Sequence, residues 1–106
     1  MLEQFGNVME MVKRLQHNVA NMEEQLKNEN IEVASGDAVK VVMNGQQEVM
    51  DIELNPKYLT ADNALLLQNL ITNTVNSAYT KSREMRQKAM DQLASELNLP
   101  KIPGLF

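Results

Sequence analysis

The feature that most constrains the fold is a repeat of apolar residues in the first 26 positions, spaced alternately four and three residues apart. The repeat consists of Met1, Phe5, Val8, Val12, Leu15, Val19, Met22 and Leu26. Apolar residues at this spacing form one narrow stripe along an α-helix, the a/d seam of a heptad pattern. We predict a helix over about 1–28, ~42 Å long, whose stripe packs against another helix. The alternative, a helix lying on a sheet, usually has a wider apolar face.

Beyond Ile31 the apolar period changes to two, which is typical of strands. Two alternating segments, 37–43 and 48–54, flank Asn44-Gly45, a pair that favours a tight type I′ hairpin turn. The apolar face of this hairpin is expected to hold Val39, Val41, Met43, Met50, Ile52 and Leu54, with Lys40, Asp51 and Glu53 pointing to water. The segment 31–34 is a candidate third strand, so the strands occupy about 31–54.

A second long helix is predicted over about 60–97, after Asn55-Pro56 has ended the strand pairing, with Thr60 or Asp62 as its N-cap. Its first half is apolar over a wide arc, as expected for a helix on a sheet, and its distal half carries a narrower stripe. The tail 98–106 contains two prolines and a glycine and cannot continue the helix. Its four large apolar residues favour docking on the body or on a partner subunit over a free tail.

These elements define one α+β domain over 1–106, with a small antiparallel sheet flanked by two long helices. Helices of ~42 and ~50 Å overrun strands of ~23 Å, so their ends must pack on something other than the sheet. We expect the first helix and the distal half of the last to pair as an antiparallel arm. Because a sheet of two or three strands with open edges is marginal alone, we also expect a homodimer with protruding helical arms.

The composition offers no catalytic, metal or cofactor site, so we expect a protein that is not an enzyme. There is no Cys, the single His17 falls at an exposed heptad position, and no glycine-rich phosphate loop is present. The start, Met1-Leu2-Glu3, lacks the basic end of a signal peptide, and the longest apolar run, 64–67, is too short for a membrane span. We therefore expect a cytoplasmic location without membrane contact.

The net charge of −4 weighs against a nucleic-acid partner, but the charge is unevenly distributed. Residues 60–106 are the only positive segment, with five basic and four acidic groups. Most of its basic groups lie on the distal half of the predicted helix: Lys81 and Lys88 on one flank, Arg83 and Arg86 on the other. The first helix adds Lys13, Arg14 and His17 on its outer face. Spacing alone favours an ordinary solvated helix surface over a binding patch.

A series of short motifs runs in order along nearly the whole chain. They are Ala38-Val39-Lys40-Val41, Met43-Asn44-Gly45, Glu48-Val49, Ile52-Glu53-Leu54-Asn55-Pro56 with Leu59, Val75-Asn76-Ser77-Ala78, and Leu99-Pro100 to Phe106. In this order they resemble the YbaB/EbfC family of bacterial nucleoid-associated proteins. The resemblance implies an α-β-β-β-α fold, a tweezer-like homodimer, and cytoplasmic DNA binding associated with the nucleoid.

The chain departs from the family pattern at three places. Ala38 replaces the second glycine of the usual Gly-x-Gly, Asn55-Pro56 replaces the usual Asp-Pro, and the first helix, often rich in lysine, is net acidic. Because DNA affinity depends on neutralising phosphates with Lys and Arg, the acidic helix predicts weak binding with little readout of base sequence.

The leading hypothesis is a nucleoid-associated homodimer that binds duplex DNA and organises the nucleoid or regulates genes. The residues expected to contact phosphates are Lys81, Arg83, Arg86 and Lys88, assisted by Lys13 and Arg14. The alternative is a chaperone-like or structural module whose arms grip a protein client through Met-rich surface. Exposed Met9, Met11, Met85 or Met90 would favour the client, whereas basic inner faces of the arms would favour DNA.

Overall fold

The computed structural model describes residues 2–97, with side chains from residue 6 onward, so the expectations for Met1, Phe5 and the tail 98–106 lie outside the described residues. Its elements are α1 (Leu2–Asn28), β1 (Asn30–Ser35), β2 (Val39–Asn44), β3 (Val49–Leu54) and α2 (Ala64–Glu96), with two short 3-10 turns at Pro56–Tyr58 and Ala61–Asn63. This order confirms the predicted α+β fold with two long helices around a small antiparallel sheet.

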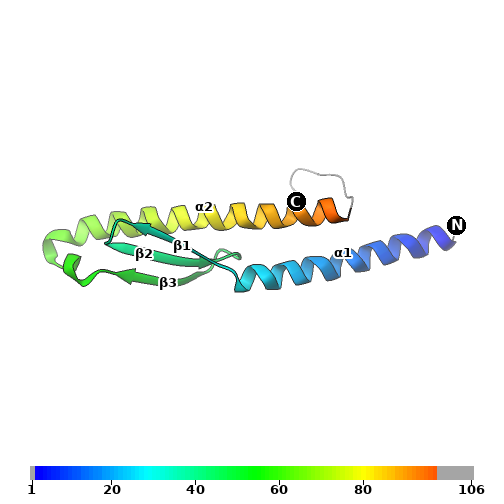
Figure 1. Ribbon diagram of the computed structural model, residues 1–106, viewed down its shortest axis with the longest axis horizontal. Coiled ribbons are helices and arrows are strands. Elements are labelled where there is room, and N and C mark those ends of the chain that lie inside the picture. The colour runs from blue at the N-terminus through cyan, green and yellow to red at the C-terminus, as the bar shows by residue number, and fades with distance from the viewer. Residues whose placement is uncertain (1, 98–106) are drawn as a thin grey trace.

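The molecule is long and thin, with extents of 73 × 23 × 16 Å. The strands have six residues each and span only ~20 Å, so both helices continue well beyond the sheet. Figure 1 shows α2 running along the sheet and past its end, while α1 leaves the sheet in the same direction as the distal half of α2. The overrun predicted from element lengths is therefore present.

The three strands form one antiparallel sheet in the order β1-β2-β3. Val39 pairs with Leu54 and Val41 with Ile52, which places these four side chains on one face as predicted. The register then shifts between Val42 and Met43, so that Met43 lies opposite Val49. Met50 was expected on the covered apolar face and is instead 55% exposed at this irregularity.

The turn between β2 and β3 also differs from the prediction. Gly45 has no positive φ, and the left-handed residue is Gln47, with φ 60°. The Gln47 N–H donates to the Asn44 carbonyl at 3.2 Å, and the Asn44 N–H donates to the Glu48 carbonyl at 3.0 Å. These bonds define a three-residue loop, a common alternative to the two-residue type I′ turn. In this loop the Gly45 N–H also donates to the Leu26 carbonyl of α1 at 2.8 Å.

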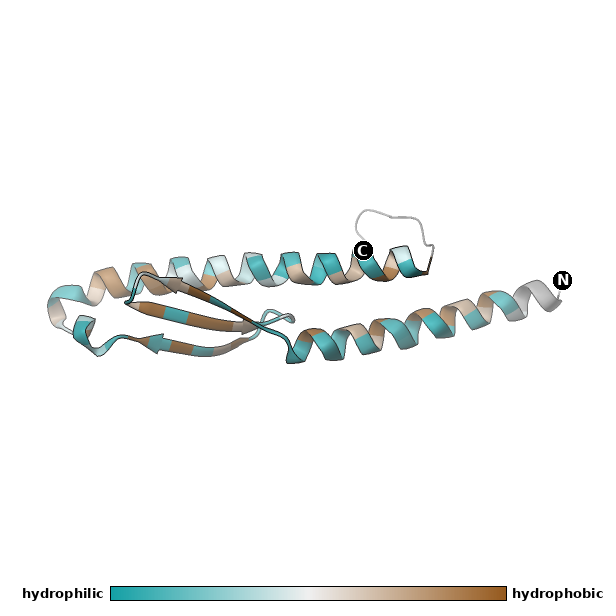
Figure 2. Cartoon of the chain, in the orientation of Figure 1, coloured by the Kyte–Doolittle hydropathy of each residue, from teal (hydrophilic) through white to brown (hydrophobic). Residues whose placement is uncertain are grey.

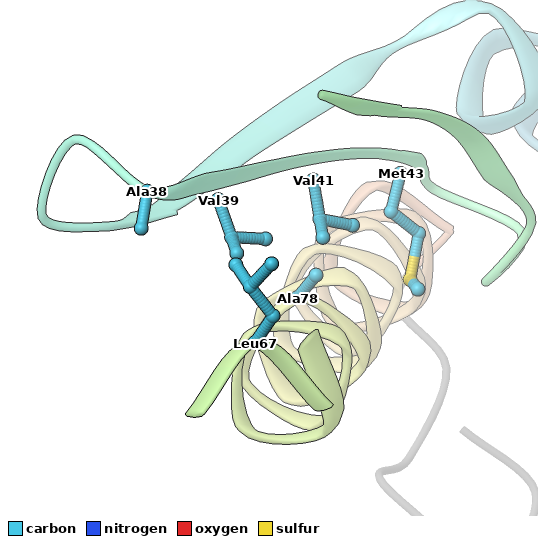
Figure 3. Packing of buried hydrophobic residues seen from close by; sticks show 6 residues of the cluster. All are labelled: Ala38, Val39, Val41, Met43, Leu67 and Ala78. Carbon is cyan, nitrogen blue, oxygen red and sulfur yellow. The ribbon is translucent and has the colours of Figure 1, made fainter. Parts of the chain in front are cut away.

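The main core lies between α2 and the sheet, where α2 packs chiefly on β1 and β2. Its buried residues, shown in Figure 3, are Val39, Val41 and Met43 from β2, Ala38 from the turn just before β2, and Leu67 and Ala78 from α2. Ala38 is only 5% exposed, so its methyl group, which departs from the Gly-x-Gly pattern of the resemblance, fills part of this core.

A second apolar cluster joins the two helices beyond the sheet. Met22 and Leu26 of α1 and Leu93 of α2 are buried in it, and the partly buried residues around them are Val19, Met85, Ala89, Met90 and Leu97. The expected packing of the α1 seam on the distal half of α2 is thus confirmed over this stretch. Figure 2 shows hydrophobic residues recurring along α1 beyond the cluster, where Val8 and Val12 are exposed.

The start of α2 corrects the predicted N-cap. The helix begins at Ala64 with Asn63 at the N-cap position, while Thr60 occupies the N-cap position of the preceding 3-10 turn, and neither side chain makes a capping hydrogen bond. Asn55 caps the first 3-10 turn by accepting the Lys57 N–H at 3.1 Å, and its amide also donates to the Asp37 carbonyl at 3.1 Å. An aspartate could not donate that second bond, so the Asn55-Pro56 departure ties this turn to the β1–β2 connection.

Replacing Gly45 by Ala is expected to destabilise the fold by about 1–3 kcal/mol, because an added Cβ would lie 2.8 Å from the Leu26 carbonyl oxygen and its Cδ2. The measurement is urea unfolding followed by far-ultraviolet circular dichroism. Gly6→Ala is the matched control: nothing lies within 4 Å of its added Cβ, and Ala in an exposed helix stabilises by about 0.5–1 kcal/mol. Equal effects from both changes would contradict the close approach at Gly45.

Candidate nucleic-acid interface

The turn between β2 and β3 lies between the two helices and fixes how they leave the sheet. Asn44 is 1% exposed, and its side-chain amide donates to the Lys27 carbonyl at 3.1 Å and to Glu48 Oε1 at 2.9 Å. Its Oδ1 accepts the backbone N–H groups of Gln46 and Glu48, both at 3.0 Å. All the polar capacity of this side chain is therefore used, and the turn satisfies carbonyls at the C-terminal end of α1.

The same turn contacts α2 through Ser82, which is fully buried. The Ser82 hydroxyl donates to the Asn44 carbonyl at 2.6 Å and accepts from Gln47 Nε2 at 2.9 Å. Both helices are thus bonded to one four-residue segment. The positions of the basic residues on the helices follow from this junction.

Arg86 lies beside the junction and pairs with Glu23 of α1. Arg86 Nη1 is 2.9 Å from Glu23 Oε2, and Nη2 pairs with Oε1, so the contact is bidentate. Gln46 Nε2 also donates to the Glu23 carbonyl at 2.9 Å. The hydrogen bonds from Arg86 lower the pKa of Glu23 below its ordinary value of 4.5, against the opposing effect of partial burial. Glu23 in turn raises the pKa of Arg86.

The other three basic residues predicted on α2 are exposed. The Arg83 guanidinium lies over the Tyr79 ring, 5.9 Å from its centroid. Lys88 borders a hollow between the arms, together with Gln25, Glu29 and Gln92. Lys81 and Lys88 are on the flank of α2 opposite Arg86, as the helical spacing predicted.

Lys13 and Arg14 lie on the outer part of α1, where both are exposed. They are about 15 Å farther out along α1 than Glu23, since ten residues of helix separate Lys13 from it. Arg14 borders an apolar hollow of about 300 Å³ lined by Val8, Met11, Val12, Leu15 and Leu97. The structure therefore does not bring Lys13 and Arg14 into one patch with the basic residues near the junction.

The basic residues of the sheet region differ from those of the helices. Lys40 pairs with Glu53 at 3.1 Å, and Lys57 pairs with Asp37 at 2.7 Å. Over residues 6–97, the basic side chains without a carboxylate partner within 4.0 Å all lie on α1 and α2: Lys13, Arg14, Lys27, Lys81, Arg83 and Lys88. The positive charge available to a ligand is therefore concentrated on the helices.

The sequence reasoning missed a row of amide side chains between the arms. Asn18, Asn21, Gln25 and Gln92 line a groove of about 370 Å³ over the buried Met22 and Leu93. Asn18 and Gln25 lie one heptad apart beside the apolar seam, so the sequence alone could have placed both amides at the edge of the contact between the helices. Gln92 could not be added from the sequence because its place depends on the register between α1 and α2.

Two negative observations apply to the part of the chain that the structure describes. Neither helix there has an apolar stretch long enough to cross a membrane. No group of three or more His, Cys, Asp or Glu side chains in that part is arranged to hold a metal ion. The solitary His17 is exposed, 3.3 Å from the amide nitrogen of Asn21.

Comparison with known proteins decides the family. The YbaB/EbfC DNA-binding family matches residues 1–97, which is nearly the whole chain. The chain belongs to this family. The resemblance noted from the short motifs is therefore confirmed.

Curated relatives of this YbaB/EbfC member are similar over nearly their whole lengths. A nucleoid-associated protein of Syntrophobacter fumaroxidans is 41% identical over 103 residues, covering 94% of each chain. A nucleoid-associated protein of Pelotomaculum thermopropionicum is 38% identical, covering 95% of this chain and 94% of its own. The crystal structure of an uncharacterized Helicobacter pylori protein shares the fold, with a TM-score of 0.71 at 20% identity, covering 88% of this chain and 96% of that one.

The Glu23–Arg86 pair predicts a pH dependence of stability in this YbaB/EbfC member. Because folding lowers the Glu23 pKa, the stabilisation is present above pH ~4.5 and is lost as the pH falls through the folded-state pKa. The difference in unfolding free energy between the wild type and Glu23→Gln, up to about 1 kcal/mol, should be constant above pH ~5.5 and shrink below it. Urea unfolding at a series of pH values measures this difference. A difference independent of pH down to 3 would contradict it.

Proposed function

We propose that this protein binds duplex DNA as a homodimer, mainly through phosphate contacts, and organises the nucleoid or regulates genes in the cytoplasm. The main support for this proposal is that the chain belongs to a DNA-binding family and that its relatives are called nucleoid-associated proteins. A second observation supports it: the basic side chains without a carboxylate partner in the described residues lie on the two helices.

The distribution of charge suggests which side approaches DNA. The face of the sheet turned away from α2 carries Glu32, Asp51 and Glu53, with Lys40 already paired to Glu53. This face repels a polyanion. The arms carry Lys81, Arg83 and Lys88, and Lys13 and Arg14 farther out assist from α1. With a net charge of −4, binding of this kind is weak, tolerant of sequence and strongly dependent on salt.

The homodimer is supported by an apolar strip on β3. Ile52 and Val49 face the same side of the sheet as the buried Val41 and Met43, yet they are 41% and 45% exposed because α2 lies over β1 and β2. β3 is an edge strand of the sheet, and hydrophobic stretches are visible along it in Figure 2. A second copy that packs against β3 would cover the strip and protect the open strand edge.

A second candidate function is a chaperone-like module with a protein client. Met9 and Met11 are 53% and 54% exposed on the outer part of α1, which favours it, whereas Met85 and Met90 pack in the cluster between the arms. Titration of duplex DNA at several salt concentrations separates the two functions. A DNA-binding protein loses affinity steeply with salt, whereas a client-binding arm gives no steep dependence of duplex binding on salt.

Replacing Lys81 and Lys88 together by Ala should weaken binding to a duplex of mixed sequence. Each lost phosphate contact lowers the slope of log affinity against log salt by about 0.9, so a dimer loses up to about 3.6 units. Fluorescence anisotropy between 20 and 200 mM salt measures this slope. The matched control is Lys40→Ala with Lys57→Ala, which removes the same charge from ion-paired sites on the sheet region and should leave the slope unchanged. Equal effects in both variants, or no binding by the wild type at 50 mM salt, would refute this interface.

Replacing Ile52 by Glu should convert the dimer into a monomer. The chain mass is 12.0 kDa, so light scattering should change from about 24 kDa to about 12 kDa. Met9→Glu is the control, since it places the same charge at a similarly exposed apolar site on the arm, away from β3. A wild type that is monomeric at micromolar concentration, or a dimer dissociated only by Met9→Glu, would contradict the β3 interface.

A further inference from the structure

The Glu23–Arg86 contact has an unusual position among the ion pairs of residues 6–97. The other two pairs, Lys40–Glu53 and Lys57–Asp37, lie on the sheet and its connections, whereas this one joins the two helical arms. It also involves one of the four arginine and lysine side chains on the part of α2 proposed to face DNA. A residue expected to bind phosphate is thus already bound to a carboxylate.

The geometry of the contact matches the way in which arginine binds phosphate. Each of the two guanidinium Nη atoms of Arg86 contacts one of the two carboxylate oxygens of Glu23. A planar guanidinium uses this same two-pronged arrangement for carboxylate and for phosphate groups. Arg86 therefore cannot hold a phosphate with this pair of donors while Glu23 occupies them.

The pair is within reach of a ligand in solvent, because the side chains of Arg86 and Glu23 are 35% and 31% exposed. Arg83 lies nearby on the same flank of α2, one turn before Arg86, and is exposed. The Arg83 guanidinium lies over Tyr79 and not over Glu23, so the carboxylate neutralises Arg86 alone.

Gln46 keeps Glu23 in this position. Its side-chain amide donates to the Glu23 backbone carbonyl at 2.9 Å and to the Glu23 side chain at 3.3 Å. Gln46 belongs to the turn that is bonded to both helices, so the carboxylate is held by the same segment that joins them. The bond to the Glu23 backbone does not depend on the charge of the side chain.

We propose that Glu23 withholds Arg86 from DNA and so limits the DNA affinity of this protein. This inference rests on the proposed function, and it identifies Glu23 as an affinity-limiting residue that contacts no phosphate itself. In the wild type, Arg86 stays paired across the arms. When Glu23 loses its charge, Arg86 becomes an additional phosphate-binding group beside Arg83.

The test compares Glu23→Gln with Glu24→Gln by anisotropy on one mixed-sequence duplex between 20 and 200 mM salt. Both variants lose one negative charge, but Glu24 is exposed and has no ion-pair partner among the described residues, so only the first change frees Arg86. Glu23→Gln should steepen the salt slope by about 0.9 per chain and tighten binding roughly three- to tenfold at 50 mM salt. Adding Arg86→Ala to Glu23→Gln should remove this gain.

A second comparison keeps Glu23 unchanged. It remains informative if circular dichroism shows that Glu23→Gln does not fold. Arg86→Ala alone should leave the salt slope within about half a unit of the wild type, whereas Lys88→Ala should reduce it by about 0.9 per chain. Equal losses of slope in these two variants would show that Arg86 already contacts DNA and would overturn the inference.

The outcomes also separate this inference from the proposed function. Binding by the wild type with equal gains in Glu23→Gln and Glu24→Gln, or with a gain in neither, overturns the role of Glu23 and leaves DNA binding intact. Absence of binding by the wild type and by both variants at 20 mM salt overturns the proposed function and the inference together. Binding by the wild type, with a gain in Glu23→Gln but not in Glu24→Gln that is removed by adding Arg86→Ala, supports the inference.

Discussion

The hydrogen bonds of one buried turn hold this structure together. Asn44 bonds to the last turn of α1, Gly45 approaches Leu26 too closely for any side chain, and the Asn44 carbonyl accepts from Ser82 of α2. At the other end of the sheet, Ser35 and Thr74 bond at 2.5 Å and fix β1 on α2. Polar contacts thus set the placement of helices whose apolar contacts alone, along a narrow stripe, allow sliding.

The segregation of charge follows from this arrangement. Lysines of the sheet region find carboxylates on neighbouring strands and turns, because cross-strand pairs and short connections bring them together. On α1 and α2 most basic residues project to solvent. Arg86 is the exception, because the junction brings Glu23 of the other helix within bonding distance. A chain with a negative average charge therefore carries its available positive charge on the two arms.

Periodicity predicted the elements and their order well, since a heptad stripe and a two-residue alternation are local properties of the chain. The details that failed depend on tertiary contacts. Asn44-Gly45 is a type I′ signal when considered alone, but in the structure the Gly45 N–H binds the end of α1 within a three-residue loop, and Val49 lies opposite Met43 with Met50 exposed. Prediction of the candidate site from the sequence was limited in the same way. The flanks of α2 could be read from spacing, whereas the pairing of Arg86 with Glu23, 63 residues away, required the register between the helices.

α1 is attached over its C-terminal part only, by the turn at residues 44–47 and by the cluster with α2 from Val19 onward, so its outer part acts as a lever. Its 27 residues place the far end about 40 Å from the turn that holds the other end. A rotation of about 10° at that turn displaces the far end by about 7 Å, more than one helical pitch. The width that the outer parts of the arms can straddle therefore depends on small angles at residues 44–47 and on the packing of Met22, Leu26 and Leu93 beside them. Substitutions in the turn can change this gap without any change on the outer part of α1.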